Sequence, residues 1–408
     1  MSYFLRELVS LFFLAWEQRK LNEISEIIGG GTPSTENFAY WDGDIDWYAP
    51  AEINGQIYVN GSERKITKLG LEKSSAKLLP ANKTVLFTSR AGIGKTAILK
   101  RTGATNQGFQ SIVLNSNTDI YFVYSMTNII KDKAEKIASG STFAEISGKM
   151  LGNLEFMFPK MEEQKKIGEV FNRIDNLITL HQRKCDKLVN IKKSLLEKMF
   201  PKNGNNVPEI RFKGFTEAWE QRKVTDVGKI FIGLVTTMTK NYTDVGTLLI
   251  RNSDIKDNHF EFDSNPIHLD EGFAKSNDSR RMHIGDVVTV HTGDVGTSAV
   301  ITEKEDGSIG FATIVTRPNK EIIDSNYLST YLNTEQHKNW AINQSTGDGR
   351  TNYNLKEFTQ LIVPLPSLKE QQCISKYIKQ IDNLITLHQK KLNKLKNIKK
   401  SLLDKMFV

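Results

Sequence analysis

The stretch Ile174–Lys184, "IDNLITLHQRK", returns as "IDNLITLHQKK" at Ile381–Lys391, 207 residues further along the chain. "NIKKSLLEKMF", which begins at Asn190, returns at the same offset as "NIKKSLLDKMF". "WEQRK" begins at Trp16 and again at Trp219, an offset of 203. Two copies of one unit of roughly 200 residues therefore account for the 408-residue chain, which indicates duplication of a whole domain pair rather than a solenoid.

The repeated segments have the pattern of long helices. Residues 162–200 contain no proline and one glycine, and their apolar residues recur at alternating spacings of three and four. This heptad seam comprises Ile167, Phe171, Ile174, Ile178, His181, Cys185, Leu188, Leu195 and Met199, and in the second copy Ile374, Ile378, Ile381, Ile385, His388, Leu392, Leu395, Leu402 and Met406. Helices of about 39 residues, about 58 Å long, cannot bury such seams alone. We therefore expect an antiparallel pair related by a pseudo-twofold axis.

Two further features of these helices each have two interpretations. His181 and His388 lie on the seam, where a polar residue fixes the helix register; a catalytic or pH-sensing role is the alternative. The helices carry net charges of +4 (residues 162–202) and +7 (residues 369–408), which leaves about −3 for the rest of the chain. Such a lysine-rich face is either a solvated surface or a surface for an acidic protein or the DNA backbone.

The segments 17–155 and 220–362 resemble each other only in scattered places and have the pattern of mixed α/β structure. Short β-favouring runs alternate with Gly, Asn and Asp turns. They are Thr84–Thr88, Ser111–Leu114, Thr247–Arg251, Asp286–His291 and Ala299–Thr302. The fold class predicted is α+β: two pseudo-symmetric mixed α/β domains separated by two long antiparallel coiled-coil helices. Near-identical helices suit a shared structural role, and divergent domains suit two different targets.

"TSRAGIGKT", which begins at Thr88, has the look of a phosphate-binding loop, but the sequence disfavours a nucleotide-hydrolysing enzyme. Ser89 stands where such a loop needs its first glycine, and the second copy has Thr297 at the position of Lys95. β-favouring residues follow in both copies, so we expect a strand–turn–strand whose glycines adopt positive φ. Methyltransferase and dinucleotide-binding signatures are also missing from the sequence, which favours a binding protein over an enzyme.

The bulk composition limits the class of protein. The net charge of +8 fits an anionic partner such as nucleic acid. There are two cysteines and no Cys/His cluster with metal-ligand spacing, so neither a disulfide framework nor a metal site is expected. The apolar run Leu8–Ala15 is much shorter than the about 20 residues of a membrane span and lacks signal-peptide features. We expect a cytoplasmic protein with no membrane attachment.

The doubled pattern resembles the specificity subunit of type I restriction–modification systems. The resemblance rests on "WEQRK", on the helix body "IDNLITLHQ", and on a proline followed by Glu-Gln where each helix begins: "FPKMEEQKKI" (Phe158–Ile167) and "LPSLKEQQCI" (Leu365–Ile374). The lead-in "PEIRFKGFTEAWEQRK" (Pro208–Lys223) is also similar to the family, whereas residues 1–15 depart from it. The resemblance covers nearly the whole chain from Trp16.

This resemblance implies a division of the chain by residue number. An atypical segment spans 1–15, target-recognition domains span 16–158 and 219–364, conserved spacer helices span 159–203 and 365–408, and a linker spans 204–218. Each domain would bind one half of a bipartite, asymmetric site in double-stranded DNA. Both domains would meet one face of the duplex if the half-site centres lie about 34–36 Å apart. The helices would set this spacing and dock two modification (methyltransferase) subunits.

The resemblance also implies that the chain is not an enzyme and holds no cofactor or metal itself. The modification subunits would methylate adenine with S-adenosylmethionine, and restriction subunits, with ATP and magnesium, would translocate and cleave DNA. The alternative is a stand-alone coiled-coil DNA-binding or scaffold protein without a methyltransferase partner.

Base recognition in the major groove uses side chains with paired donors and acceptors, such as Arg or Lys for guanine and Asn or Gln for adenine. In the first domain the candidates are Thr88, Ser89, Arg90, Lys95 and the loop Ser139–Lys149, with Lys149 itself. In the second they are Arg251, Asn252, His291, Thr292, Arg350, Asn352, Tyr353 and Asn354. Arg280 and Arg281 are expected on phosphates, which position the protein without specifying sequence. For each, an ordinary loop or turn role is the alternative; Arg350→Ala should weaken mainly the second half-site.

Overall fold

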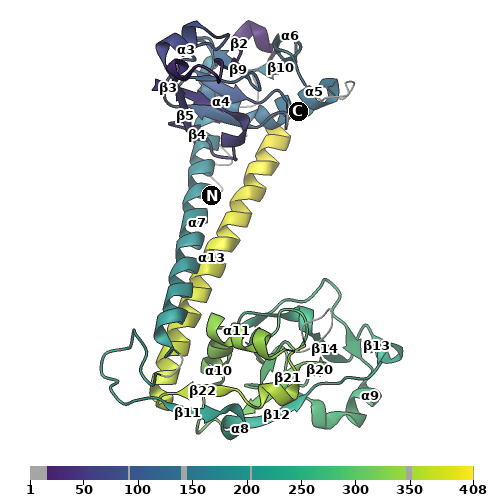
Figure 1. The fold of residues 1–408 in the computed structure, drawn as a ribbon. Helices are drawn as coiled ribbons and strands as arrows, with labels where there is room; N and C mark the ends of the chain where they lie inside the picture. The colour runs from purple at the N-terminus through teal and green to yellow at the C-terminus, as the bar shows by residue number, and fades with distance from the viewer. Residues whose placement is uncertain (1–15, 91, 139–144, 203–204, 346–351, 408) are drawn as a thin grey trace. The chain divides into compact units, whose positions relative to one another are not determined.

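Two long helices dominate the computed structural model, which describes residues 16–90, 92–138, 145–202, 205–345 and 352–407 (Figure 1). They are α7 (Met161–Met199) and α13 (Leu368–Met406), each a continuous 39-residue helix. Both carry glutamate in the first turn and lysine in the last, which complements the helix dipole. The helices expected from the repeat are therefore confirmed.

The chain forms two compact units, and the helices pair antiparallel within each. Unit 1 comprises residues 1–182 with 390–408, and unit 2 comprises residues 183–389. In unit 1 the Phe171 and Phe407 rings stack at 6.1 Å, and Lys399 Nζ lies 2.6 Å from Asp175. In unit 2, Lys192 Nζ lies 2.6 Å from Asp382. These two residues are the repeat counterparts of Lys399 and Asp175. The division into units falls within the helices rather than at their ends.

The heptad seam is the buried side of each helix. Buried seam residues are Ile167, Phe171, Ile174, Cys185, Met199, Ile374, Ile378, Ile381, Leu392 and Met406. The two seam histidines, His181 and His388, are half-buried, so the role of a register-fixing polar residue stays a prediction. Each fully buried aliphatic side chain contributes about 1.5–3 kcal/mol relative to exposure.

The described residues of the first domain form one two-stranded sheet and two larger sheets. β1 (Glu17–Lys20) pairs antiparallel with β10 (Glu155–Phe158), a five-stranded sheet has the order β2-β9-β6-β7-β4, and a three-stranded sheet has the order β5-β3-β8. The remaining strands are β2 (Ser25–Gly29), β3 (Trp41–Tyr48), β4 (Tyr58–Val59), β5 (Arg64–Ile66), β6 (Thr84–Phe87), β7 (Thr96–Leu99), β8 (Gly103–Thr105) and β9 (Gln110–Leu114). The helices are α2 (Leu21–Ile24), α3 (Lys68–Glu72), α4 (Ile120–Ser125), α5 (Thr127–Ala138) and α6 (Gly148–Gly152).

The second domain repeats the plan with different details. β11 (Glu220–Lys223) pairs antiparallel with β22 (Ile362–Leu365), and the main sheets have the orders β12-β21-β18-β19 and β13-β17-β14-β20. The other strands are β12 (Gly228–Ile232), β13 (Tyr242–Thr243), β14 (Thr247–Arg251), β15 (Ile255–Lys256), β16 (His259–Phe260), β17 (His268–Leu269), β18 (Val287–Thr289), β19 (Ser298–Val300), β20 (Ile309–Phe311) and β21 (Ile314–Pro318). The helices are α8 (Val224–Val227), α9 (Glu271–Ser276), α10 (Ser325–Leu332), α11 (Glu335–Gln344) and α12 (Leu355–Phe358).

All five β-favouring runs named from the sequence overlap strands, which are β6, β9, β14, β18 and β19. Each domain core also includes both long helices. Ile167 of α7 and Met406 of α13 belong to the core of the first domain, and Ile374 of α13 and Met199 of α7 belong to that of the second. Packing of this kind fixes the helix ends rigidly to the domains.

Candidate nucleic-acid interface

The turn between β6 and β7 occupies the stretch that resembles a phosphate-binding loop. The two strands pair antiparallel. Across the turn, the Thr88 hydroxyl donates to the Gly92 carbonyl at 2.6 Å and accepts from the Lys95 amide at 2.9 Å. Gly92 and Gly94 have φ of +105° and +82°, a region that favours glycine. The expected strand–turn–strand is confirmed, because a phosphate loop would lead into a helix.

The turn between β18 and β19 in the second domain has the same backbone plan. Its Gly293 and Gly296 have φ of +102° and +85°. The Val290 amide donates to the Thr297 carbonyl at 2.8 Å, as the Thr88 amide does to the Lys95 carbonyl in the first domain at 3.0 Å. Corresponding backbone positions in the two domains therefore present different side chains.

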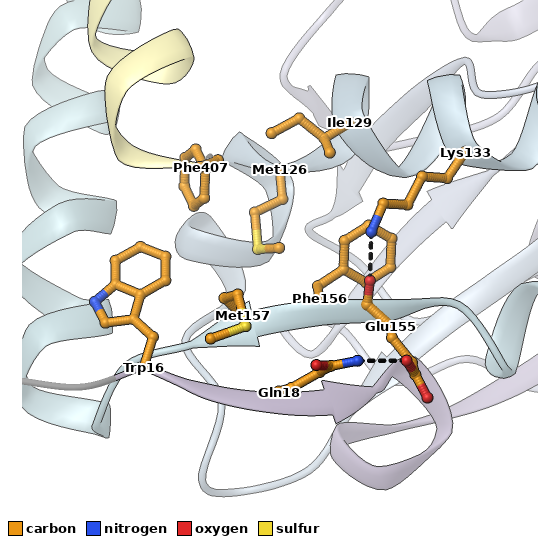
Figure 2. A pocket seen from close by; sticks show the side chains of 9 residues that line it. All are labelled: Trp16, Gln18, Met126, Ile129, Lys133, Glu155, Phe156, Met157 and Phe407. Carbon is orange, nitrogen blue, oxygen red and sulfur yellow. Dashed lines mark hydrogen bonds between the residues drawn. The ribbon is translucent and has the colours of Figure 1, made fainter.

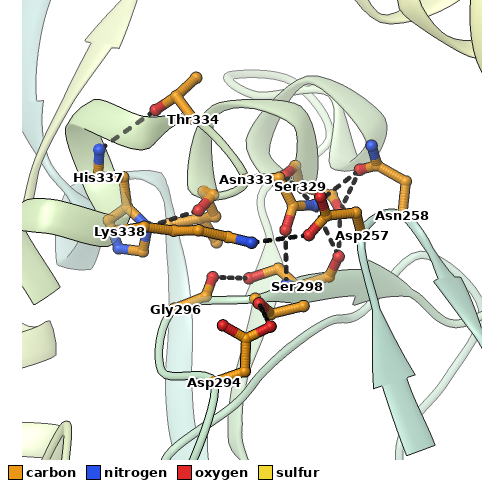
Figure 3. A network of polar contacts seen from close by, with 12 residues as sticks. Asp257, Asn258, Asp294, Gly296, Ser298, Ser329, Asn333, Thr334, His337 and Lys338 are labelled. Carbon is orange, nitrogen blue, oxygen red and sulfur yellow. Dashed lines mark hydrogen bonds and ion pairs between the residues drawn. The ribbon is translucent and has the colours of Figure 1, made fainter. Parts of the chain in front are cut away.

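A polar network lies beside the second turn (Figure 3). The Ser298 amide donates to Asn333 Oδ1 at 2.9 Å, and Asn333 Nδ2 donates to Asn258 Oδ1 at 3.0 Å. The Ser329 hydroxyl donates to the same Asn258 oxygen at 2.9 Å. Buried polar groups that satisfy one another in this way hold the turn in one conformation.

In each domain, backbone hydrogen bonds join the turn to the loop that precedes α6 or α12. The Ile146 amide donates to the Ser89 carbonyl at 3.0 Å, and the equivalent Tyr353 amide donates to the His291 carbonyl at 2.8 Å. Isolated β-bridges flank these bonds: Arg90 with Glu145, and Thr292 with Asn352. The turn and the loop, which we name the turn–loop surface of each domain, are thus one structural element.

Three of the predicted base-contacting side chains are fully buried, namely those of Thr88, Ser89 and Tyr353. Thr88 uses its hydroxyl within the turn. The Tyr353 ring lies 5.8 Å from the His337 ring and 5.9 Å from the Trp340 ring. Burial leaves these three side chains out of reach of DNA in this structure, so their direct contact with bases stays an untested prediction that the structure does not favour. They shape the turn–loop surface instead.

Five other predicted residues, from three distant segments, form one cluster in the second domain. The His291 amide donates to Asn252 Oδ1 at 2.9 Å, and His291 Nδ1 lies 2.6 Å from the Thr292 hydroxyl. That hydroxyl donates to Asn352 Oδ1 at 2.9 Å. Burial lowers the pKa of His291, against the opposing effect of a hydrogen bond with Asn354. A neutral imidazole both donates and accepts, which suits contact with base edges.

Three of the predicted arginines of the second domain, Arg251, Arg280 and Arg281, are engaged within the domain. Arg251 and Arg281 each contact two carboxylates: Arg251 with Asp254 (2.7 Å) and Asp263 (3.0 Å), and Arg281 with Glu271 (2.7 Å) and Asp278 (3.0 Å). Hydrogen bonds to Asp254 and Asp263 raise the pKa of Arg251 above its usual value. Arg280 donates to the Ile232 carbonyl. Their contact with DNA stays a prediction, and the charges of Arg251 and Arg281 are largely compensated by the carboxylates that they contact.

The turn–loop surface of the first domain is basic. Lys95 and Lys149 are exposed, and Arg90 is half-buried. A further lysine, Lys131 of α5, was missed from the sequence: a Cβ placed on Gly94 would lie 2.4 Å from Lys131 Cγ, so its stem lies against the turn. No local sequence signal points to Lys131, because the contact arises from tertiary packing.

The turn of the second domain has an exposed carboxylate that was also missed. Asp294 accepts from the Thr297 hydroxyl at 2.8 Å and stands at the tip of the turn. A carboxylate suits a cytosine amino group and repels phosphate. Arg350 and residues 139–144 lie outside the described residues, so their predicted contacts have no structural account.

The described residues contain no group of three or more His, Cys, Asp and Glu placed to hold a metal ion. None of the helices in the described part of the chain is both long and apolar enough to cross a bilayer.

Comparison with protein families identifies the repeat. The model described as "Type I restriction modification DNA specificity domain" matches residues 14–190 and 216–397. The specificity subunit of type I restriction enzyme MjaIX from Methanocaldococcus jannaschii is 33% identical over 228 residues, 53% of this chain and 52% of that protein. The EcoR124I/EcoR124II specificity subunit of Escherichia coli is 29% identical over 182 residues, 43% of this chain and 45% of that protein. The match thus spans about half the length of these two relatives.

Two further relatives match over most of this chain. A putative specificity subunit, MjaX of M. jannaschii, is 25% identical over 95% of this chain and 92% of its own length. The crystal structure of a type I restriction–modification S subunit from M. genitalium has the same fold, with a TM-score of 0.59, 15% identity and 97% coverage of both chains. Because the family model matches most of the chain in two successive copies, this chain belongs to the family of type I restriction–modification DNA specificity domains.

Proposed function

We propose that this chain is the non-catalytic specificity subunit of a type I restriction–modification complex, in which each domain reads one half of a bipartite, asymmetric DNA site. The observation that carries the proposal is the turn–loop surface, present twice on one backbone plan with different side chains. Thr292 stands at the position of Arg90, and Thr297 at that of Lys95. Different donors and acceptors at corresponding positions favour different bases.

The helices serve in this proposal as a spacer of fixed length. Each domain core contains residues of both helices, which ties the domains to rigid elements. Each unit also has the same inter-helix ion pair, Asp175 with Lys399 and Asp382 with Lys192. Equal pairing in both units favours one defined register of the helices, and hence one gap between the half-sites.

The outer faces of the helices support docking of two equivalent modification subunits. Leu177 and Leu180 of α7 are 44% and 45% exposed, and their counterparts Leu384 and Leu387 of α13 are 45% and 46% exposed. Large aliphatic side chains exposed in the same pattern twice fit two copies of one partner.

The chemistry of the proposed complex lies in the partner subunits. The modification subunits would methylate adenine with S-adenosylmethionine, and restriction subunits would use ATP and magnesium to translocate and cleave DNA. We place this complex in the cytoplasm.

Methylation mapping tests the proposal. The chain would be expressed with its modification subunits, and methylated adenines would be mapped across genomic DNA. We expect one bipartite site, and Lys95→Ala should change recognition only in the half-site of the first domain. Lys83→Ala, an exposed lysine before β6 and away from the turn, is the matched control. Failure to copurify with a methyltransferase, together with the absence of methylation, would favour a stand-alone DNA-binding or scaffold protein.

A further inference from the structure

The connection between β8 and β9 in the first domain is a tight turn, residues 106–109, with Gln107 at its tip. The Phe109 amide donates to the Asn106 carbonyl at 3.3 Å, and Asn106 Oδ1 accepts from the Gly108 amide at 2.8 Å. An asparagine that bonds to the amide two residues further on is typical of the first position of such a turn. Gln107 is exposed, so the turn holds its side chain in solvent in one backbone conformation.

This turn continues the turn–loop surface of the first domain by one more segment. Thr88 and Phe109 form an antiparallel β-bridge. Because side chains alternate along paired segments, this register places Arg90 and Gln107, two positions further on, next to each other on one face. On its other side, Arg90 forms a β-bridge with Glu145. Gln107, Arg90 and Glu145 therefore form one row across three neighbouring segments.

The second domain has an equivalent row, in which the flanking amide comes from a different segment. In the first domain, the Ser89 amide donates to the Gly108 carbonyl of the 106–109 turn at 2.8 Å. At the corresponding position of the second domain, the His291 amide donates instead to the side chain of Asn252, at 2.9 Å from Oδ1. An amide side chain thus flanks the second turn on the side where the 106–109 turn lies in the first domain.

The first domain cannot use the position of Asn252, because its counterpart there is Pro50. Each of these two residues begins a 3-10 helix, Pro50–Glu52 or Asn252–Asp254, whose third residue accepts from the amide of the capping residue. A proline side chain has neither donor nor acceptor. Gly108 lies directly against Pro50, since a Cβ on Gly108 would be 2.7 Å from Pro50 Cγ. The turn that carries Gln107 therefore covers this position and supplies an amide in its place.

The amino group of Gln107 is available for an external partner. The Thr32 hydroxyl donates to Gln107 Oε1, which fixes the orientation of the amide. Among the described residues, Gln107 Nε2 makes no hydrogen bond. Gln18 of the same domain differs in this respect, because its Nε2 donates to Glu155 Oε2 at 2.5 Å (Figure 2). The Gln107 amide thus offers two N–H donors and a second lone pair on its oxygen.

We propose that Gln107 is a further specificity-determining residue of the first domain, and that it selects an adenine in the major groove of the first half-site. The adenine edge presents N7 as an acceptor and the N6 amino group as a donor. Gln107 Nε2 donates to N7, and the second lone pair of Oε1 accepts from N6. Thr32 bonds to Gln107 and not to the base, so it is a positioning residue. The inference rests on the proposed function, because it requires the turn–loop surface to meet DNA.

Competition binding by the complex of this chain with its modification subunits tests the inference. The duplexes carry the site found by methylation mapping, with each base pair of the first half-site varied in turn. Gln107→Ala should abolish a preference for adenine of about 5- to 150-fold at one position and leave the second half-site unchanged. Gln107→Glu should shift the preference at that position toward cytosine, whose amino group donates to a carboxylate. Asn117→Ala, at an exposed amide beyond the other end of β9, is the matched control.

The positioning role of Thr32 has its own test. Thr32→Val removes the hydroxyl that orients the Gln107 amide and should weaken the same adenine preference by about 2- to 10-fold. Thr32→Ser keeps a hydroxyl and should retain the preference. A role of Thr32 in folding alone would instead weaken binding to all the duplexes equally.

Each alternative outcome has a definite meaning. An unchanged base preference in Gln107→Ala, or the loss of a preference for a base other than adenine, would overturn the inference. An equal loss on every duplex would also overturn it, because Gln107 would then contact only the DNA backbone. Recognition of the second half-site shows that each variant is folded. If the unaltered complex selects no bipartite site, the proposed function fails; if it does and Gln107→Ala changes nothing, only this inference fails.

Discussion

Removing the Arg211 guanidinium should destabilise unit 2 by about 2–3 kcal/mol. Arg211→Ala leaves Glu370, whose side chain is 1% exposed, as a buried charge without its partner, which costs about 3–5 kcal/mol in such cases. The hydrogen bonds to Glu370 also raise the pKa of Arg211 above its usual value, which agrees with a favourable pair.

The cost of Arg211→Ala should fall at or below the lower limit of that 3–5 kcal/mol range for a structural reason. Among the described residues, the buried Trp219 indole N–H has no partner, whereas in unit 1 the equivalent Trp16 N–H donates to Glu163 at 3.1 Å. If Trp219 in the variant adopted the arrangement of Trp16, its indole N–H would donate to Glu370, and a hydrogen bond to a charged group returns about 1.5–3 kcal/mol. Water that enters the space left by the arginine would also reduce the destabilisation caused by Arg211→Ala.

Urea unfolding of a double-mutant cycle measures this pair. Arg211→Ala and Glu370→Gln are made singly and together, and hydrogen exchange of α10 in unit 2 is compared with α4 in unit 1. We expect faster exchange in α10 only, and a double variant that is more stable than the sum of the single effects predicts. A loss below about 0.5 kcal/mol for Arg211→Ala, or purely additive effects, would refute the reasoning.

Three further perturbations probe the turns and the core. Gly94→Ala should cost about 2 kcal/mol or more in thermal unfolding, because φ is +82° and the new Cβ would meet Lys131; Gly55→Ala, with φ of +86° and open space around it, should cost less. Thr292→Val removes a hydroxyl from the second turn–loop surface and should change methylation in the second half-site alone. Burial lowers the pKa of His337 to about 4, so below about pH 6.5 the unfolded chain takes up the proton first. Stability should therefore fall by about 3 kcal/mol as the pH drops from 6.5 to 4, and His337→Gln should flatten this dependence in urea titrations.

Features set by local sequence were predictable. The helix expected over residues 162–200 is found at Met161–Met199, because heptad spacing and the absence of proline act within a few turns of helix. The strand–turn–strand at Thr88–Thr96 was equally accessible, since β-favouring residues flank glycines that adopt positive φ. In both cases, the deciding interactions join residues close in sequence.

Features that depend on tertiary contacts were not predictable. The Ser89 side chain is polar and lies next to a turn, yet it is fully buried because the loop that contains Ile146 bonds to its backbone. Lys131 reaches the turn from a helix about forty residues away in sequence. The Arg211–Glu370 pair joins residues 159 positions apart, and no pattern in either local segment predicts this contact.

The two copies are nearly identical in their helices and differ in their domains, and the contacts of the residues concerned explain why. Asp175 pairs with Lys399, and Lys399 is the repeat counterpart of Lys192, which pairs with Asp382. A substitution at one of these positions would change the ion pair in one unit and not in the other. Antiparallel pairing therefore favours the same sequence in both helices. The β-bridges of Arg90 and Thr292 lie within their own domains, so the helix seam does not require these two residues to agree. Exchanging the turn–loop residues of one domain should therefore change which DNA sequence is bound while leaving helix pairing intact, whereas Lys399→Ala should weaken helix pairing without a preference for either half-site sequence.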